Sequence, residues 1–278
     1  MEYSSDTGSH IVAQMFRYRP RDKEAQEVVE CMRRRQLARA KNVLRAYDKI
    51  LNPLIAVPGS PGLGKSTFLA HFPESEAYKT YLGPNHSAIV STFTFNSGMR
   101  RLSCGEDCLG LRILYGAAVG MGLQGCEDLG WVEFATRFPL YNLDVHDAIY
   151  ILRDVFGSHR RILLLVDELS KALNDKRCMS QLGEVLGDHG YCDVVVSALC
   201  PNYVSELLTG LQRGIDYVVL PPMLDSDLGQ SECVVWANDL LQTVGNSKVD
   251  AYKQNMLRNV YLLCSGHPRY LNKKEFVK

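Results

Sequence analysis

Residues 59–66 read Gly59-Ser60-Pro61-Gly62-Leu63-Gly64-Lys65-Ser66 and match the pattern GxxxxGK[ST] at every fixed position. An apolar run of strand character at 54–57 precedes them, and a helical run at 67–70 follows them. A strand before and a helix after are the context in which this pattern forms a loop that holds phosphate groups. We therefore interpret residues 59–67 as a phosphate-binding loop rather than a glycine-rich surface turn.

The residue types of this loop suit a nucleoside triphosphate with Mg²⁺. Glycines let the backbone curl so that successive N–H groups point at phosphate oxygens. We expect Lys65 to place its charge on the β- and γ-phosphates, where it is also catalytic, and the Ser66 hydroxyl to ligate Mg²⁺. The residues predicted to bind the nucleotide, which we expect to be ATP, are Gly59, Ser60, Pro61, Gly62, Leu63, Gly64, Lys65, Ser66 and Thr67.

An acidic pair follows a strongly apolar segment. Residues 162–166 are all Ile, Leu or Val, which is typical of a strand buried on both faces, and Asp167-Glu168 come directly after them. We expect Asp167 to hold Mg²⁺ through its water shell. Glu168 is the predicted general base that polarises the attacking water. An ordinary acidic helix cap is the alternative, and the phosphate-binding loop upstream favours the catalytic interpretation.

Short apolar runs alternate with helical stretches after Asn52. Strands are expected at 54–57, 89–95, 162–166, 194–199 and 215–220, and helices at 65–71, 110–122, 146–156, 176–187 and 203–212. Such alternation predicts a parallel sheet with helices on both faces. The predicted fold class is α/β, a three-layer core over residues 51–223 with a five-stranded, mostly parallel sheet.

Polar side chains at the ends of other elements are further candidates. Ser197 ends one predicted strand and Asn96 follows another, so either is placed to contact the γ-phosphate or the water, or else to bond the local backbone. Arg213 stands just before the strand at 215–220. An arginine finger there would supply on the order of 10³–10⁵ in rate. A cation that complements the carboxyl end of a helix is the alternative.

The sequence after Pro221-Pro222 is helical, at 226–243 and 250–264, and predicts a small helical lid over residues 224–278. Gly266-His267-Pro268-Arg269 lies late in this lid. Pro268 suits the first turn of a helix, which places Arg269 near the positive end of that helix. A cation is unfavourable there, so we expect Arg269 to contact nucleotide phosphate. His267 is placed either against the base or in a surface turn.

The first fifty residues divide into a loose arm, 1–20, and a basic helix, 21–50. Residues 31–50 carry seven basic side chains against one acid, Asp48. Two interpretations stay open for this helix: a solvated face, and a basic patch for targeting or for nucleic acid, the latter over residues 33–45.

Composition limits the other classes of function. The formal net charge is zero, so no global field draws the chain to nucleic acid or to an acidic membrane. No segment approaches the roughly 18 apolar residues of a membrane span. The first ten residues lack a signal-peptide pattern, so we expect an intracellular protein of nucleus or cytoplasm. The nine scattered cysteines predict reduced, buried side chains rather than a disulfide framework.

Together these residues resemble the additional-strand, catalytic-glutamate class of P-loop NTPases, near the AAA+ and STAND groups. The resemblance implies that the strand ending in Ser197 lies between the phosphate-loop strand and the Asp167 strand. It also implies that Arg269 stands where AAA+ proteins carry their second sensor, and Arg213 where their finger lies. The Gly266-His267-Pro268 string is similar to the GxP motif of the STAND helical region.

Three short strings resemble, more narrowly, the NTPase module of Crinkler and retrotransposon-hot-spot (RHS) proteins. They are Val166-Asp167-Glu168-Leu169-Ser170-Lys171, Thr94-Phe95-Asn96-Ser97-Gly98-Met99 and Leu220-Pro221-Pro222-Met223. The resemblance covers residues 50–271. Members of this family are often effectors or nuclear proteins, so it implies a similar setting for this chain.

The leading functional hypothesis is an ATPase whose hydrolysis resets a molecular switch. The alternative is a nucleotide-gated scaffold with little hydrolysis that binds protein or nucleic acid. Glu168 favours the first, and the open role of Arg213 keeps the second. A GTPase is disfavoured because the nearest guanine-reading string, Ser247-Lys248-Val249-Asp250, follows a polar turn. A homo-oligomer would allow a neighbouring copy to supply the catalytic arginine.

Overall fold

A computed structural model of the chain describes residues 21–41, 52–60, 63–84, 86–95, 109–123, 125–126, 129–139, 143–169, 181–186, 189–199 and 214–221. The elements are α2 (Asp22–Lys41), β1 (Leu54–Pro58), α3 (Lys65–His71), η2 (Phe72–Glu74), α4 (Glu76–Leu82), β2 (Ala88–Thr94), α5 (Leu109–Gly120), α6 (Trp131–Arg137), α7 (Val145–Phe156), β3 (Arg161–Asp167), β4 (Cys192–Ala198) and β5 (Ile215–Tyr217). The predicted arm, 1–20, and the predicted lid, 224–278, lie outside the described residues.

The chain divides into two compact units. One comprises Arg21–Gly59 and Lys65–Val219, and the other comprises Met1–Pro20, Ser60–Gly64 and Leu220–Lys278. All the helices and strands named above belong to the first unit, and the fold described below is the fold of that unit.

Within the described residues, five strands form one sheet in the order β2-β3-β4-β1-β5, and each neighbouring pair is parallel. The strand β4 lies between β1 and β3. Ser197 pairs with Val57 of β1, and its neighbour Val196 pairs with Val166 of β3. The α/β fold class and the five-stranded parallel sheet predicted from the sequence are therefore confirmed, and the strand ending in Ser197 has the expected central place.

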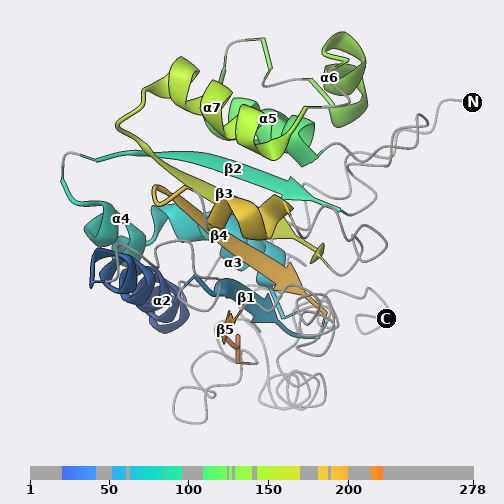
Figure 1. Cartoon of the computed structure of the whole chain (residues 1–278). Coiled ribbons are helices and arrows are strands. Elements are labelled where there is room, and N and C mark those ends of the chain that lie inside the picture. Colours follow the sequence, from blue (N-terminus) through green and yellow to red (C-terminus); the bar gives the residue numbers. More distant parts are fainter. Residues whose placement is uncertain are drawn as a thin grey trace, which may run out of the picture. The chain divides into compact units, whose positions relative to one another are not determined.

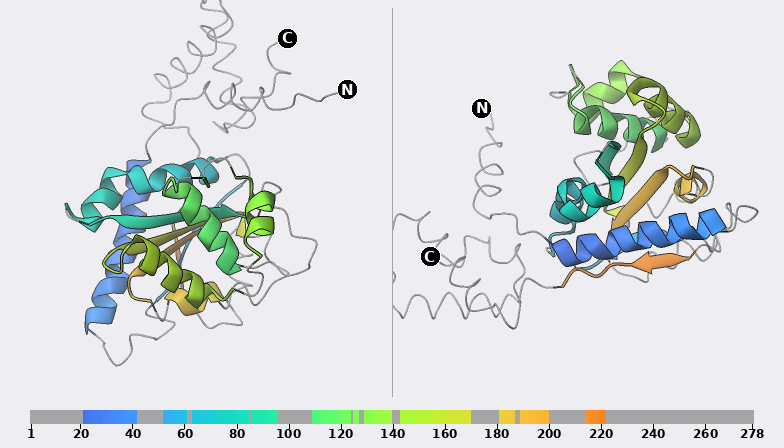
Figure 2. Two further views of the ribbon diagram at one scale, coloured as in Figure 1. Left: turned by 90° about the horizontal axis from the view of Figure 1, so that it is seen from above. Right: turned by 90° about the vertical axis from the view of Figure 1, so that its left-hand side faces the viewer.

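Helices cover both faces of the sheet (Figures 1 and 2). The chain moves one way along the sheet from β1 to β2 and the opposite way from β2 through β3 to β4. Since parallel crossovers are right-handed, the connecting helices fall on opposite faces. Helices α5, α6 and α7 and the helical residues 181–186 pack into one apolar core with the strands. On the other face Phe68 of α3 packs near Phe72, which in turn lies 5.1 Å from the ring of Tyr78 in α4.

The close packing of α5 on β2 requires a glycine. A Cβ atom built at Gly116 would stand 2.6 Å from the carbonyl oxygen of Thr92 and 2.8 Å from the hydroxyl of Ser91. A Cβ atom does not approach other heavy atoms so closely, so any larger residue here would push the helix away from the strand.

Where the structure describes them, the predicted elements agree with the observed ones to within a few residues; the helix expected at 203–212, the start of the one expected at 176–187 and residues 42–50 of the basic helix lie outside the described residues. The helix expected at 65–71 is α3, and the strand expected at 162–166 is the central part of β3. The strand expected at 215–220 is shorter, at Ile215–Tyr217. Helices α4 and α6 were not predicted from the sequence, because a seven-residue helix shows little periodicity. Ser75 was a usable signal, since its hydroxyl caps α4 by accepting from the N–H of Tyr78.

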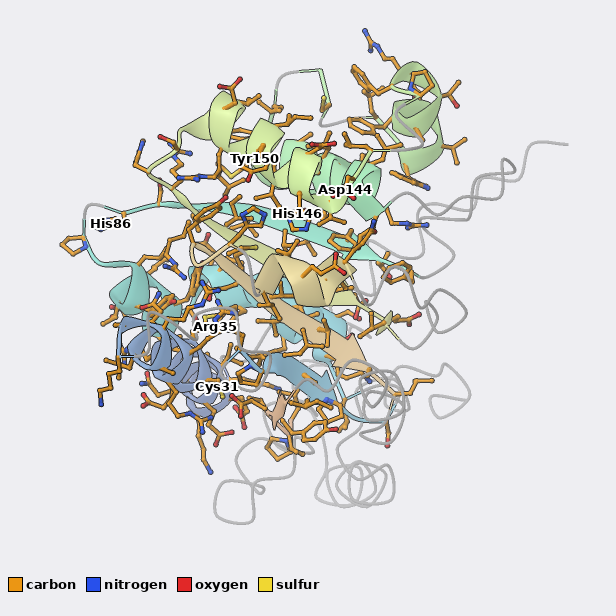
Figure 3. All side chains as sticks on the ribbon, viewed as in Figure 1. Cys31, Arg35, His86, Asp144, His146 and Tyr150 are labelled. Carbon is orange, nitrogen blue, oxygen red and sulfur yellow. The ribbon has the colours of Figure 1, made fainter. Side chains whose placement is uncertain are left out.

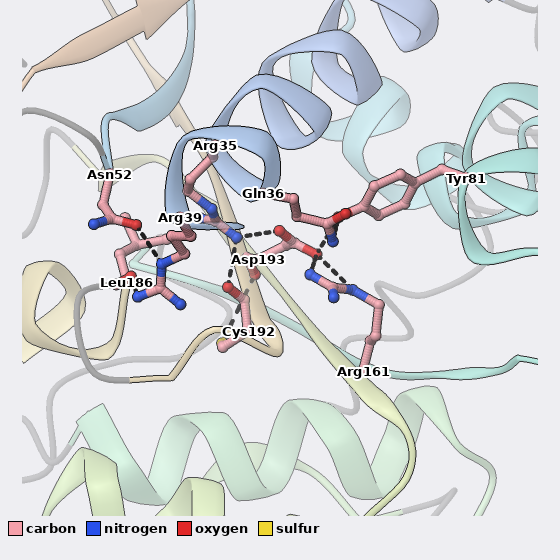
Figure 4. A network of polar contacts seen from close by, with 9 residues as sticks. All are labelled: Arg35, Gln36, Arg39, Asn52, Tyr81, Arg161, Leu186, Cys192 and Asp193. Atoms are coloured by element: carbon pink, nitrogen blue, oxygen red, sulfur yellow. Dashed lines mark hydrogen bonds and ion pairs between the residues drawn. The ribbon is translucent and has the colours of Figure 1, made fainter. Parts of the chain in front are cut away.

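The helix α2 is anchored by arginines that the sequence suggested were solvated. Arg35 is 3% exposed and forms an ion pair with Asp193 at the start of β4, and it donates to the carbonyl of Cys192 at 2.7 Å. Arg39 donates to the side chain of Asn52 and to the carbonyl of Leu186. Figure 3 shows Arg35 on α2, and Figure 4 shows the network around Asp193. The interpretation as a solvated face is therefore wrong for Arg35 and Arg39.

Two other expectations concern the state of the cysteines and membrane-spanning helices. Cys31 and Cys192 are free and buried, as expected of reduced cysteines in a large core, and burial raises the pKa of both thiols. Among the helices that the structure describes, none has the length and apolar character needed to cross a membrane.

Candidate functional site

The candidate site lies where β1, β3 and β4 end. In an open parallel sheet, ligands bind at the carboxyl ends of the strands. Asp167 is the last residue of β3, and Ser66 is the second residue of α3, the helix that follows β1 and the loop. The Ser66 hydroxyl donates to Oδ2 of Asp167 at 2.8 Å, although 101 residues separate them. The fold thus brings together the two residues predicted to hold Mg²⁺.

Gly59 and Lys65 are the two motif residues of this unit that flank residues 60–64. The Lys65 ammonium donates to the carbonyl oxygen of Gly59 at 2.6 Å. The N–H of Gly59 in turn donates to the carbonyl of Ala198 at 3.1 Å, which joins the first residue of the motif to the end of β4. Lys65 is buried, whereas Ser66 and Thr67 beside it are exposed.

The residues between these ends belong to the second unit. Gly64 has a φ of +83°, in the left-handed region that favours glycine. Ser60 is exposed, and its carbonyl accepts from the N–H of Leu63 at 3.4 Å. Pro61 and Gly62 lie outside the described residues, so their contribution to nucleotide binding stays a prediction.

Glu168 adopts an unusual backbone conformation. Its φ is +53°, and among the described residues no other non-glycine residue has a positive φ. Its N–H donates to the Ser197 hydroxyl at 2.9 Å. The residue before it is held from the other side, because the N–H of Phe95 donates to the carbonyl of Asp167 at 3.2 Å. The turn that carries the predicted general base is therefore fixed by both neighbouring strands.

Ser197 contacts the acidic pair directly. Its hydroxyl donates to Oδ1 of Asp167 at 2.5 Å, and its side chain is fully buried. The sequence placed this residue near the acidic pair without indicating that its hydroxyl would bond to it. The sequence also offered bonding to local backbone as the alternative, but the observed partners are 29 and 30 residues away.

The residues present fit Mg²⁺. Hydroxyl and carboxylate oxygens are hard donors of the kind this ion prefers, and Mg²⁺ typically takes one or two carboxylates, with waters and phosphates completing its shell. Ser66 and Asp167 supply such oxygens side by side. Hydroxyl donors at both oxygens of Asp167 also suit its carboxylate form, because an ionised carboxylate only accepts.

The other residues predicted for the site are Asn96, Arg213, His267 and Arg269. All of them lie outside the described residues. Their roles as contacts to phosphate, base or water stay predictions.

A second polar cluster, which the sequence analysis did not single out, joins α7 to the turn before β4. Nδ1 of His146 lies 2.8 Å from Nε2 of His189, whose Nδ1 lies 2.7 Å from the Tyr191 hydroxyl. Figure 3 labels His146 beside Asp144, whose carboxylate caps α7. The histidines stand 43 residues apart without a motif, so no signal in the sequence could have paired them.

Comparisons with known proteins bear on the fold. No protein-family model matches the chain, and no curated protein matches it significantly. Among solved structures, it is similar to a Walker-type ATPase of Pyrococcus abyssi, with 13% identity and a TM-score of 0.54, covering 95% of this chain and 73% of that one. Another similar structure is the ORC2 protein of Aeropyrum pernix in ADPNP–ADP complexes, with 11% identity and a TM-score of 0.49. The match covers 87% of this chain and 68% of that one.

The sheet order, the phosphate-loop motif and the similarity to the Pyrococcus abyssi ATPase together identify the fold. They show that the chain has the fold of P-loop NTPases, with the motif between β1 and α3.

Proposed function

We propose that this chain binds ATP with Mg²⁺ and hydrolyses it, and that the nucleotide state works as a molecular switch. The observation that carries the proposal is the 2.8 Å contact between the Ser66 hydroxyl and the Asp167 carboxylate, directly beside Lys65. A phosphate-binding lysine, a metal-binding hydroxyl and a metal-binding carboxylate are the parts that phosphoryl transfer needs.

Each residue has a separate task in this proposal. Lys65 now donates to Gly59, and it would exchange that carbonyl for the more strongly accepting phosphate oxygens. Ser66 and Asp167 would hold Mg²⁺, which would neutralise the charge that develops on the phosphate oxygens. Glu168 would accept a proton from the attacking water, since a carboxylate one residue beyond the metal-binding acid is placed for this role.

Substitution of Glu168 tests the proposal. Glu168→Gln keeps the size of the side chain and removes its basicity, so hydrolysis should fall by about 10²–10⁴-fold. Binding of a fluorescent ATP analogue should persist in the same variant, and Lys65→Ala should weaken it. Glu133→Gln, on the exposed side of α6, is the matched control and should hydrolyse like the parent. Parent-like hydrolysis by Glu168→Gln would remove the catalytic assignment.

The same measurement separates the enzyme from the scaffold alternative. A scaffold binds ATP or ADP in the parent chain, but its slow turnover is unchanged by Glu168→Gln. A dependence of specific activity on protein concentration would indicate a homo-oligomer in which one copy completes the site of the next.

The finer parts of the proposal rest on sequence alone. They are the finger role of Arg213, the contacts of His267 and Arg269 in a lid, and a setting in an effector or nuclear protein of the Crinkler/RHS type. Nucleic-acid binding by the basic helix is weakened as a proposal, because Arg35 and Arg39 already bond within the fold. Affinity for DNA that does not change between about 50 and 200 mM salt would count against it.

A further inference from the structure

We propose that Ser197 is a positioning residue, which acts on hydrolysis by fixing the backbone of Glu168 and does not itself bind phosphate. The inference rests on the proposed function, because it concerns how the general base of that reaction is held. Its basis is the burial of Ser197, the pattern of its hydrogen bonds and the backbone conformation of Glu168.

The hydroxyl of Ser197 is already fully used as a donor. A serine hydroxyl carries one hydrogen, and here that hydrogen is given to Oδ1 of Asp167. Phosphate oxygens at neutral pH are acceptors, so a contact with the γ-phosphate would require Ser197 to release Asp167. The side chain is also fully buried, whereas Asp167 and Glu168 are partly exposed. The acidic pair is therefore partly accessible to solvent, whereas the Ser197 side chain is not.

The backbone of Glu168 needs support of this kind. A left-handed conformation costs a residue with a side chain about 1–2 kcal/mol, so it persists where neighbouring groups favour it. The N–H of Glu168 donates to the Ser197 hydroxyl at 2.9 Å, which is such a group. Successive side chains along a strand alternate between its faces, and a left-handed residue directly after β3 ends that alternation. The hydrogen bond from Ser197 thus helps to set where the predicted base lies.

A positioning residue and a phosphate-binding residue have different kinetic signatures. If Ser197 acts through Glu168, its loss lowers the rate of hydrolysis by about 10- to 100-fold, the scale of a small misplacement of a catalytic group. Its loss should leave nucleotide affinity within about twofold of the parent, since an interaction absent from the bound nucleotide changes kcat alone. Once Glu168 has lost its basicity, the correct placement of that side chain no longer matters.

The experiment is a double-mutant cycle of Ser197→Ala and Glu168→Gln, with single-turnover ATP hydrolysis and the Kd of a fluorescent ATP analogue measured for each variant. We expect Ser197→Ala to slow the parent but to change the Glu168→Gln variant by less than about twofold. Equal factors in both backgrounds would show that Ser197 does not act through Glu168, and a raised Kd for ATP without a raised Kd for ADP would show that it acts on the phosphate; either result would overturn the proposal.

A second readout does not depend on hydrolysis. Amide hydrogen exchange measured on peptides that contain Glu168 should be faster in Ser197→Ala by at least about tenfold, because the bond that protects this N–H is gone. Unchanged exchange would overturn the proposal. If Glu168→Gln hydrolyses ATP like the parent, the proposed function fails, and hydrogen exchange still decides whether Ser197 holds the turn.

Two variants guard against a general loss of folding. Ser91→Ala removes a buried strand serine whose hydroxyl donates to the carbonyl of Ile113 at 2.7 Å, away from the acidic pair. It should match Ser197→Ala in lost stability and keep parental hydrolysis and exchange at Glu168. If Ser197→Ala does not fold, Ser197→Cys keeps the shape with a weaker donor and should give an effect of the same kind but smaller.

Discussion

Asp167 and Asp193 lie on the neighbouring strands β3 and β4, one at the carboxyl end and the other near the amino end. The two carboxylates differ in burial and in the charge of their partners. Asp193, near the start of β4, is fully buried between Arg35 and Arg161, and Arg161 contacts its Oδ2 at 2.7 Å (Figure 4). Asp167, at the end of β3, is partly exposed and accepts hydrogen bonds from the hydroxyls of Ser66 and Ser197.

The difference separates a structural carboxylate from one that is available for chemistry. Breaking a buried ion pair leaves a charge without compensation, so Asp193 is tied to its arginines whatever the ligand state. Hydroxyl groups are neutral partners, and each of their hydrogen bonds to a charged carboxylate contributes about 1.5–3 kcal/mol. A divalent cation with its waters can therefore replace the Ser66 hydroxyl at Asp167. The following predictions test this contrast, beginning with the largest effect.

Asp193→Ala should lower the free energy of unfolding by about 3–5 kcal/mol, because it leaves the buried Arg35 without its carboxylate. Urea denaturation measures this loss. Asp154→Ala, on the exposed side of α7, is the control and should stay within about 0.5 kcal/mol of the parent. A small effect at Asp193 would mean that the network does not hold α2 on the sheet.

Asp167→Asn should affect the binding of Mg²⁺ more than the stability of the fold. We expect the Mg²⁺ affinity of the ATP complex to fall by about 10- to 100-fold, as for other residues that act through a metal's water shell. The free energy of unfolding should change by less than about 3 kcal/mol, since one hydrogen bond from a hydroxyl to a charged carboxylate is lost. Magnesium titration of ATP turnover and urea denaturation of the same preparation provide both numbers. A stability loss as large as that of Asp193→Ala would erase the distinction between the two aspartates.

Alkaline pH should weaken the arginine-rich end of the sheet. Burial and the nearby charge of Asp193 raise the pKa of Tyr78 and of Tyr81 above the ordinary value. The folded chain therefore keeps these protons where the unfolded chain loses them, so the stabilisation is complete below pH about 10 and falls as pH rises further. The loss should be about 1 kcal/mol per tyrosine for each pH unit. Absorbance at alkaline pH should show these tyrosines ionising only with unfolding.

Arg34→Ala should have the smallest effect. Arg34 adjoins Arg35 in α2, but its ion pair with Asp216 spans 3.4 Å and the arginine side chain is 60% exposed. Solvent screens such pairs, and we expect a loss below about 1 kcal/mol that shrinks in high salt. Arg35→Ala, measured in parallel, should lower the free energy of unfolding by more, and its loss should depend less on salt. Equal losses would indicate that burial does not distinguish these neighbouring arginines.

Much of the chemistry was predictable because it depends on local patterns. The GxxxxGK[ST] string, the apolar run of β3 and the acidic pair after it are contiguous in sequence, and the fold class followed from the alternation of strands and helices. The short helices α4 and α6 were missed because so few residues give little periodic signal. The role of Arg35 could not be foreseen, since a run of arginines in a helix looks the same whether it faces water or a buried aspartate.

The sequence by itself determined the parallel α/β fold and the residues expected to hold phosphate and metal, because backbone geometry and residue chemistry fix those locally. Only the tertiary structure decided which side chains meet across the sheet. The parallel register of β4 between β1 and β3 brings Ser197 to Asp167 and Glu168 at one end, and α2 brings Arg35 to Asp193 at the other. These contacts join residues far apart in the chain, so they follow from packing rather than from any local pattern.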